Sequence, residues 1–82
     1  MEAKEQSDQG INIQFSRAEA LVFYEWLVRF TSEERPHHFN HGAEEQILFN
    51  FEACLEKILV EQFEENYSEL IRIYQESVFP TD

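Results

Sequence analysis

Three histidines and two carboxylates lie close together in the middle of the chain, in the segment HHFNHGAEE. His37, His38 and His41 precede Glu44 and Glu45, and imidazole and carboxylate groups are both ligands of zinc and nickel. Their spacing fits no established closed metal site, and adjacent histidines in a polar loop are usually solvated. We therefore predict that no metal is bound here.

Cys54 is the only cysteine among 82 residues. A catalytic thiol needs a cation or a helix N-terminus beside it. At helical spacing, Cys54 has the apolar neighbours Phe51, Leu55 and Ile58 instead, so we predict a core cysteine. A single cysteine forms no internal disulfide, which favours a reducing, cytoplasmic location.

Other catalytic patterns are missing from the sequence. It contains no glycine-rich phosphate loop, and no serine in a context typical of a nucleophile. Carboxylates are abundant, but we expect them on a helix face open to water, without the apolar surroundings that a general acid requires. We predict that the protein is not an enzyme and that it has no cofactor.

The whole chain has a formal net charge of -11, and acidic residues dominate its second half. One interpretation is a solvated helix face that keeps the protein in solution, and the other is a docking surface for a basic partner. Either interpretation disfavours binding to DNA or RNA. From position 44 to position 69 the only base is Lys57, and the acids are Glu44, Glu45, Glu52, Glu56, Glu61, Glu64, Glu65 and Glu69.

The elements that must position these side chains belong to one domain, because the chain is too short for two. Residues 1–10 are polar and without period, and we predict a disordered leader before a single domain over 11–80. In INIQF, apolar and polar residues alternate over 11–15. This pattern predicts a short strand, or an extended lead-in in which Phe15 packs as a hydrophobic staple.

The first helix is predicted over 17–32, because Ser16 to Glu19 form a capping box. Its apolar arc is too wide for one neighbouring helix to cover, and Trp26 lies at its margin. The arc consists of Ala20, Leu21, Phe23, Tyr24, Leu27, Val28 and Phe30.

Two further helices are predicted over 43–62 and 67–78. Asn40 or His41 is the expected cap of the former, and Asn66 that of the latter, which Pro80 follows. We expect an all-α fold: a compact three-helix domain with a short extended N-terminal segment, in which the first two helices pack along their apolar stripes. The stripe over 43–62 consists of Ile47, Leu48, Phe51, Cys54, Leu55, Ile58 and Leu59.

The stretches LVFYEWL and AEEQILFNFEACLEKILVEQFEENYSEL resemble a family of small, acidic, uncharacterised bacterial proteins. The similarity covers about residues 21–70, and Gln62 stands where that family tends to have proline. The resemblance implies a helical fold and a bacterial source. It implies no activity and no catalytic residues.

Two functions remain as hypotheses. The first is an acidic module that masks a basic protein, in the manner of an immunity protein or antitoxin. The second is a self-associating scaffold in which an apolar strip near Tyr24, Trp26 or Phe30 is buried in a homodimer. We therefore expect a homodimer or a heterocomplex, and no membrane partner, since no apolar run approaches about 18 residues. The predicted partner-binding residues are Glu45, Phe49, Glu52, Glu56, Trp26 and Glu64.

Overall fold

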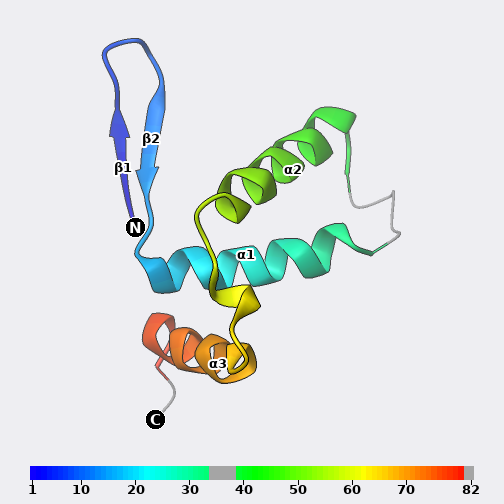
Figure 1. The fold of residues 1–82 in the computed structure, drawn as a ribbon. Coiled ribbons are helices and arrows are strands. Elements are labelled where there is room, and N and C mark those ends of the chain that lie inside the picture. The colour runs from blue at the N-terminus through cyan, green and yellow to red at the C-terminus, as the bar shows by residue number, and fades with distance from the viewer. Residues whose placement is uncertain (34–38, 81–82) are drawn as a thin grey trace.

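A helix in the middle of the molecule, α1, carries the other elements around it. The computed structural model describes residues 1–33 and 39–80, so His37 and His38 lie outside the described residues. In Figure 1, α2 packs on one side of α1 and α3 on the other, and a hairpin projects from the N-terminal end of α1. In chain order the elements are β1 Glu2–Glu5, β2 Ile11–Gln14, α1 Arg17–Thr31, α2 Gly42–Glu56, the 3-10 helix η2 Glu61–Phe63, and α3 Tyr67–Val78.

The N-terminal ten residues form half of an antiparallel hairpin, so the prediction of a disordered leader is wrong. Glu2 pairs with Gln14 and Glu5 with Ile11. The hydrogen bonds between strands join backbone groups, which explains why a polar segment without alternation is able to pair. The fold is thus mostly helical but not purely all-α.

Both interpretations of residues 11–15 describe part of the structure. Ile11–Gln14 is a strand, and Phe15, directly after it, packs partly buried against the core. The rings of Phe15 and Phe23 stack with their centres 5.8 Å apart. Phe15 therefore joins the hairpin to α1.

The predicted capping box at the start of α1 is confirmed. The Glu19 amide donates to Ser16 Oγ at 3.1 Å, and the Ser16 amide donates to Glu19 Oε1 at 2.8 Å. Two orphan amides of the first helical turn are satisfied in this way. The helix ends at Thr31, one residue before the predicted end.

The second helix ends six residues before the predicted end, at Glu56 rather than at 62. After a turn, Leu59 enters the core, where 2% of its surface is exposed, whereas Ile58 is 64% exposed. A continued helix would keep Leu59 on the α2 stripe and away from α3. Ile58 is therefore not the core residue that the stripe predicted.

The third helix spans the predicted residues, Tyr67–Val78, and Asn66 is its N-cap as predicted, but the expected side-chain bond of the cap is absent. Asn66 makes no side-chain hydrogen bond to the helix, and its backbone carbonyl accepts the first bonds instead. At α2 the cap is His41, whose Nδ1 accepts from the Ala43 amide at 2.9 Å.

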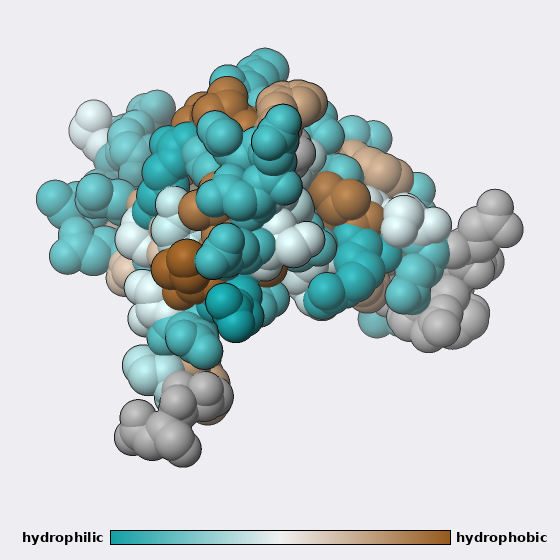
Figure 2. All heavy atoms as spheres, turned by 60° about the horizontal axis from the view of Figure 1, so that its bottom comes forward, coloured by the Kyte–Doolittle hydropathy of each residue, from teal (hydrophilic) through white to brown (hydrophobic). Residues whose placement is uncertain are grey.

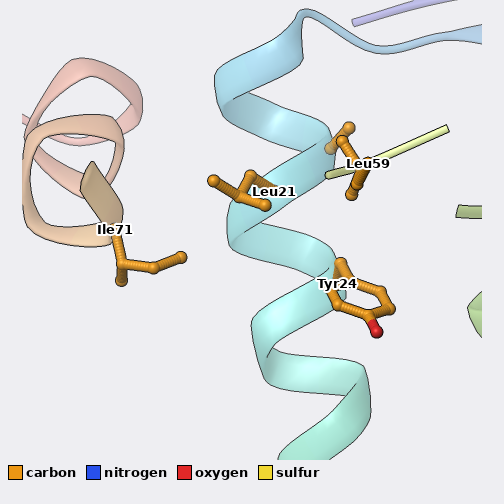
Figure 3. Close-up of a cluster of buried hydrophobic side chains, with 5 residues drawn as sticks. Leu21, Tyr24, Leu59 and Ile71 are labelled. Atoms are coloured by element: carbon orange, nitrogen blue, oxygen red, sulfur yellow. The ribbon is translucent and has the colours of Figure 1, made fainter. Parts of the chain in front are cut away.

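The core is small and centred on α1. In Figure 3, Leu21 points toward Ile71 of α3, while Tyr24 and Leu59 lie on the other side of α1. Leu21 and Leu27 are completely buried. Among the described residues, the buried apolar side chains are Ala20, Leu21, Tyr24, Leu27, Leu59 and Ile71.

The chain is open for its size. Its accessible surface is 6687 Å², whereas a compact monomer of this mass exposes about 5,200 Å². Its radius of gyration is 14.6 Å, against about 12 Å for a compact domain of this length. The isolated chain therefore leaves more surface uncovered than a compact monomer, and Ile11, Phe63 and Phe79 are among its exposed apolar residues.

Candidate protein-binding surfaces

The two flanks of α2 differ sharply in character. At 100° per residue, positions i, i+4, i+7 and i+11 of a helix share one flank. Glu45, Phe49, Glu52 and Glu56 have this spacing, and we call them the acidic flank. Ile47, Phe51, Cys54 and Ile58 have it too, with Ile58 just beyond the helix end, and we call them the apolar flank.

On the acidic flank, two carboxylates are held by α1. Tyr24 donates its hydroxyl to Glu56 Oε1 at 3.0 Å, and the Thr31 hydroxyl lies 3.0 Å from Glu52 Oε2. One oxygen of each carboxylate remains outside these contacts. Burial, and then the hydrogen bond to Glu56, raise the pKa of Tyr24 to about 12.

Phe49 lies in the middle of the acidic flank and is 43% exposed. Glu45 precedes it by one helical turn and is exposed, and Glu52 follows it by almost one turn. An exposed aromatic ring beside carboxylates offers a cation both a π face and compensating charge.

The other two predicted partner-binding residues lie elsewhere. Trp26, on α1, is 42% exposed and stacks on Phe23 and on Phe30, with ring centres 6.1 and 4.9 Å apart. Glu64 is exposed directly after η2. The structure therefore brings four of the six predicted residues together, on the acidic flank.

The prediction of an uncovered strip on α1 is correct for Trp26 and wrong for Tyr24, which is only 6% exposed. Tyr24 faces α2, whereas Trp26 borders a groove of about 400 Å³ that reaches Gln75 and Val78 of α3. The wide apolar arc is thus covered in its middle by α2, α3 and Leu59, and open at its margin.

A row of stacked aromatic rings lies along α1, and the sequence analysis did not predict it. Phe15 stacks on Phe23, Phe23 on Trp26, and Trp26 on Phe30, while Phe51 of α2 meets Phe23 edge to face at 5.7 Å. The signal was the i, i+3, i+7 spacing of Phe23, Trp26 and Phe30. The row links the hairpin, α1 and α2 through contacting rings.

An apolar groove of about 480 Å³ is lined by residues of the hairpin, the start of α1 and the end of α2. Its walls include Ile13, Phe15, Phe51, Cys54 and Ile58. Cys54 is exposed, so the prediction of a core cysteine is wrong. The reason is the rotation of α2, which directs Phe51 and Leu55 toward α1 and leaves Cys54 beside that contact.

On the α3 side of the molecule, exposed apolar side chains are scattered rather than grouped. Figure 2 is turned so that the α3 side comes forward, and its apolar patches are small and separated by polar side chains. Ile73 of α3 is 51% exposed. Single exposed apolar residues of this kind are ordinary on protein surfaces.

Within residues 1–33 and 39–80, no group of three or more metal-ligating side chains comes together. His41 acts as a helix cap. None of the helices in the described part is both long and apolar enough to cross a membrane.

Comparison with known proteins found no match: no family model fits the chain, and no curated protein and no solved structure is significantly similar to it. The resemblance to small acidic bacterial proteins therefore stays a prediction.

Proposed function

We propose that this chain is a protein-binding module whose acidic flank binds a basic protein. The observation that carries the proposal is Phe49, an exposed aromatic ring in a stripe of three glutamates on one flank of α2. Interfaces concentrate their binding energy in aromatic anchors surrounded by polar residues.

The chemistry of the flank favours a lysine or arginine side chain as the group that it receives. A guanidinium or ammonium over the Phe49 ring gains a cation–π attraction, and Glu45 supplies a carboxylate one turn away. The Tyr24 hydroxyl donates to one oxygen of Glu56. The Thr31 hydroxyl lies 3.0 Å from Glu52 Oε2 but has the Leu27 carbonyl closer, at 2.8 Å. The Glu56 carboxylate is therefore oriented before a partner arrives, which lowers the ordering cost of binding.

The overall charge supports the same type of partner. A net charge of -11 accelerates the approach of a basic protein and repels nucleic acid. Masking of a nuclease or other nucleic-acid-binding protein, as immunity proteins and antitoxins do, is the role that we propose. In such a complex the carboxylates occupy the positions of nucleic-acid phosphates on the partner.

The experiment compares two exposed phenylalanines. The chain and the variants Phe49→Ala and Phe63→Ala are used to capture proteins from cells that express it, and each captured protein is identified and purified. Phe63 is the control, because it is 80% exposed and lies in η2, away from the acidic flank. Titration calorimetry then measures the affinity of the purified pair.

We expect a basic partner whose affinity falls about tenfold or more with Phe49→Ala and little with Phe63→Ala. The affinity should also fall steeply as salt rises from about 50 to about 300 mM. A partner that binds both variants equally, or whose binding ignores salt, contradicts the proposal.

A further inference from the structure

We infer that the apolar groove between the hairpin and α2 is the contact between two copies of this chain. The inference goes beyond the proposed function, because it assigns an occupant to a face that the basic partner does not use. It rests on the large exposed surface of the chain, on the absence of carboxylates from the groove lining and on the exposed two-stranded hairpin beside the groove.

The chain as a whole exposes more surface than a compact monomer, by an amount comparable to one partner's share of a dimer contact. The chain exposes 6687 Å², about 1,500 Å² more than a compact monomer of its mass. A standard interface hides about 800 Å² per partner, and permanent homodimers hide more. The excess is therefore enough for one partner's share of a stable homodimer.

The exposed apolar side chains of this region are continuous rather than scattered. Ile13 is 48% exposed on the hairpin wall, and Ile58 is 64% exposed on the α2 wall. Ile47, 55% exposed, extends the apolar flank beyond the groove toward the N-terminal end of α2. Contiguous apolar surface on this scale marks an interaction site.

Charge explains how two chains of the same strong negative charge can meet here. None of the described residues that line the groove carries a carboxylate. Its one ionised side chain, Arg17, is bonded to Glu61. The glutamates of the acidic flank lie on the other side of α2, so the groove itself contributes no carboxylate to the contact.

Beyond Phe15 and the ion pair of the Met1 ammonium with Glu19, the hairpin receives little cover from this chain. All eight residues of β1 and β2 are exposed, and an isolated two-stranded hairpin is marginally stable in water. In a twofold-symmetric contact each copy contributes the same patch. Each hairpin would then be covered by the apolar flank or the hairpin of its partner.

Cys54 is a natural probe of this contact, because it is the only cysteine and it lines the groove. Sedimentation of the unmodified chain should show a dimer at micromolar concentration. Alkylation of Cys54 by N-ethylmaleimide should be about tenfold or more slower in the dimer than in the dilute monomer. Added salt should strengthen the dimer, because it screens the repulsion between two acidic chains.

Two matched variants locate the contact. Ile58→Glu and Ile73→Glu both add one charge at an exposed isoleucine, but only Ile58 lines the groove. We expect Ile58→Glu to raise the dimer dissociation constant about tenfold or more, and Ile73→Glu to raise it much less.

Three results would overturn the inference: a monomer at every concentration, equal alkylation rates in monomer and dimer, or equal effects of the two variants. If circular dichroism shows that Ile58→Glu is unfolded, the alkylation rates of Cys54 in the unmodified chain decide whether the groove is the dimer contact. Binding of the basic partner is measured separately on Ile58→Glu and on Phe49→Ala. Loss of the dimer is therefore distinguishable from loss of the proposed function.

Discussion

Arg17 and Glu61 join the start of α1 to η2 through a charged hydrogen bond in which one partner is buried. Arg17 Nε donates to Glu61 Oε1 at 3.0 Å, and Nη2 donates to the same oxygen. Glu61 is only 8% exposed. Its Oε2 is buried without a hydrogen-bond partner in the described part of the chain, so Arg17 alone compensates a buried carboxylate. This hydrogen bond, and then the charge of Glu61, raise the pKa of Arg17 above its ordinary value.

Removal of Arg17 should destabilise the fold more than removal of another arginine. Arg17→Ala leaves Glu61 buried and uncompensated, whereas Arg72→Ala removes an exposed side chain of α3. We expect a clearly lower urea midpoint for Arg17→Ala only. The double variant Arg17→Ala/Glu61→Met should recover much of the loss, because an apolar side chain of similar volume needs no partner. Equal urea midpoints for both arginine variants would show that the Arg17–Glu61 pair does not contribute to the stability of the fold.

Core truncations should follow burial rather than the stripe seen in the sequence. Leu21 is completely buried and Ile58 is 64% exposed. Leu21→Ala should lower the free energy of unfolding by about 2 to 5 kcal/mol. Ile58→Ala should change it by less than about 0.5 kcal/mol in dilute solution. Urea titration measures both values, and a larger loss for Ile58→Ala would refute the described end of α2.

The cap of α2 gives a local prediction. His41 Nδ1 accepts from the Ala43 amide, so His41→Ala removes the side-chain bond that caps the first turn of α2. We expect a loss of about 0.5 to 2 kcal/mol, and little loss for His41→Ser, which keeps an acceptor. Helix content by circular dichroism and urea unfolding report the difference. The idea fails if the serine variant is as unstable as the alanine variant.

The hairpin turn contains a residue in an unfavourable backbone conformation. Gln9 has a φ of 71°, in the left-handed region that residues other than glycine and asparagine seldom adopt. Gln9→Gly should therefore stabilise the hairpin by about 0.5 to 1 kcal/mol. Slower hydrogen exchange of the Gln6 amide, which donates to Gly10 O at 2.8 Å, is the direct measure. Exchange that is unchanged or faster argues against strain at this residue.

The parts of the fold that local sequence determines were predictable. The Ser16–Glu19 capping box and the limits of α3 depend on neighbouring residues, and both agree with the structure. The end of α2 depends on Leu59 finding a place between α1 and α3, a tertiary contact that periodicity does not contain. The strand Glu2–Glu5 was missed for a similar reason, because its pairing uses backbone groups and a partner several residues away.

The candidate surfaces were also predictable only in part. Spacing alone places Glu45, Phe49, Glu52 and Glu56 on one flank of a helix. Spacing cannot tell which flank a neighbouring helix covers, and so Cys54 was expected in the core although it lies on an exposed flank. The hydrogen bonds from Tyr24 and Thr31 to the acidic flank join separate helices, and no pattern within one helix indicates them.

Alkaline pH should weaken the fold through two phenols, that of the buried Tyr24 and that of the half-buried Tyr67. Tyr24 donates to Glu56, and Tyr67 donates to Glu25 Oε2 at 2.7 Å. Burial, followed by these acceptors, raises the pKa of Tyr24 from 10.0 to about 12 and raises that of Tyr67 further. The folded chain therefore keeps protons that the unfolded chain releases as the pH rises above 10.

The sign of the effect follows from this difference in proton binding. The stabilisation from the raised pKa is complete below pH 10 and is lost as the pH rises through the folded value of about 12. Urea unfolding at several pH values from 8 to about 12 should show a steady fall in the free energy of unfolding. The slope for Tyr24→Phe should be compared with that for Tyr74→Phe, because no hydrogen bond of the Tyr74 hydroxyl occurs in the described structure. We expect the slope to flatten for Tyr24→Phe and to persist for Tyr74→Phe. A slope unchanged by Tyr24→Phe would mean that the Tyr24 phenol ionises equally in the folded and unfolded chain, and that its bond to Glu56 does not hold α2 against α1 in solution.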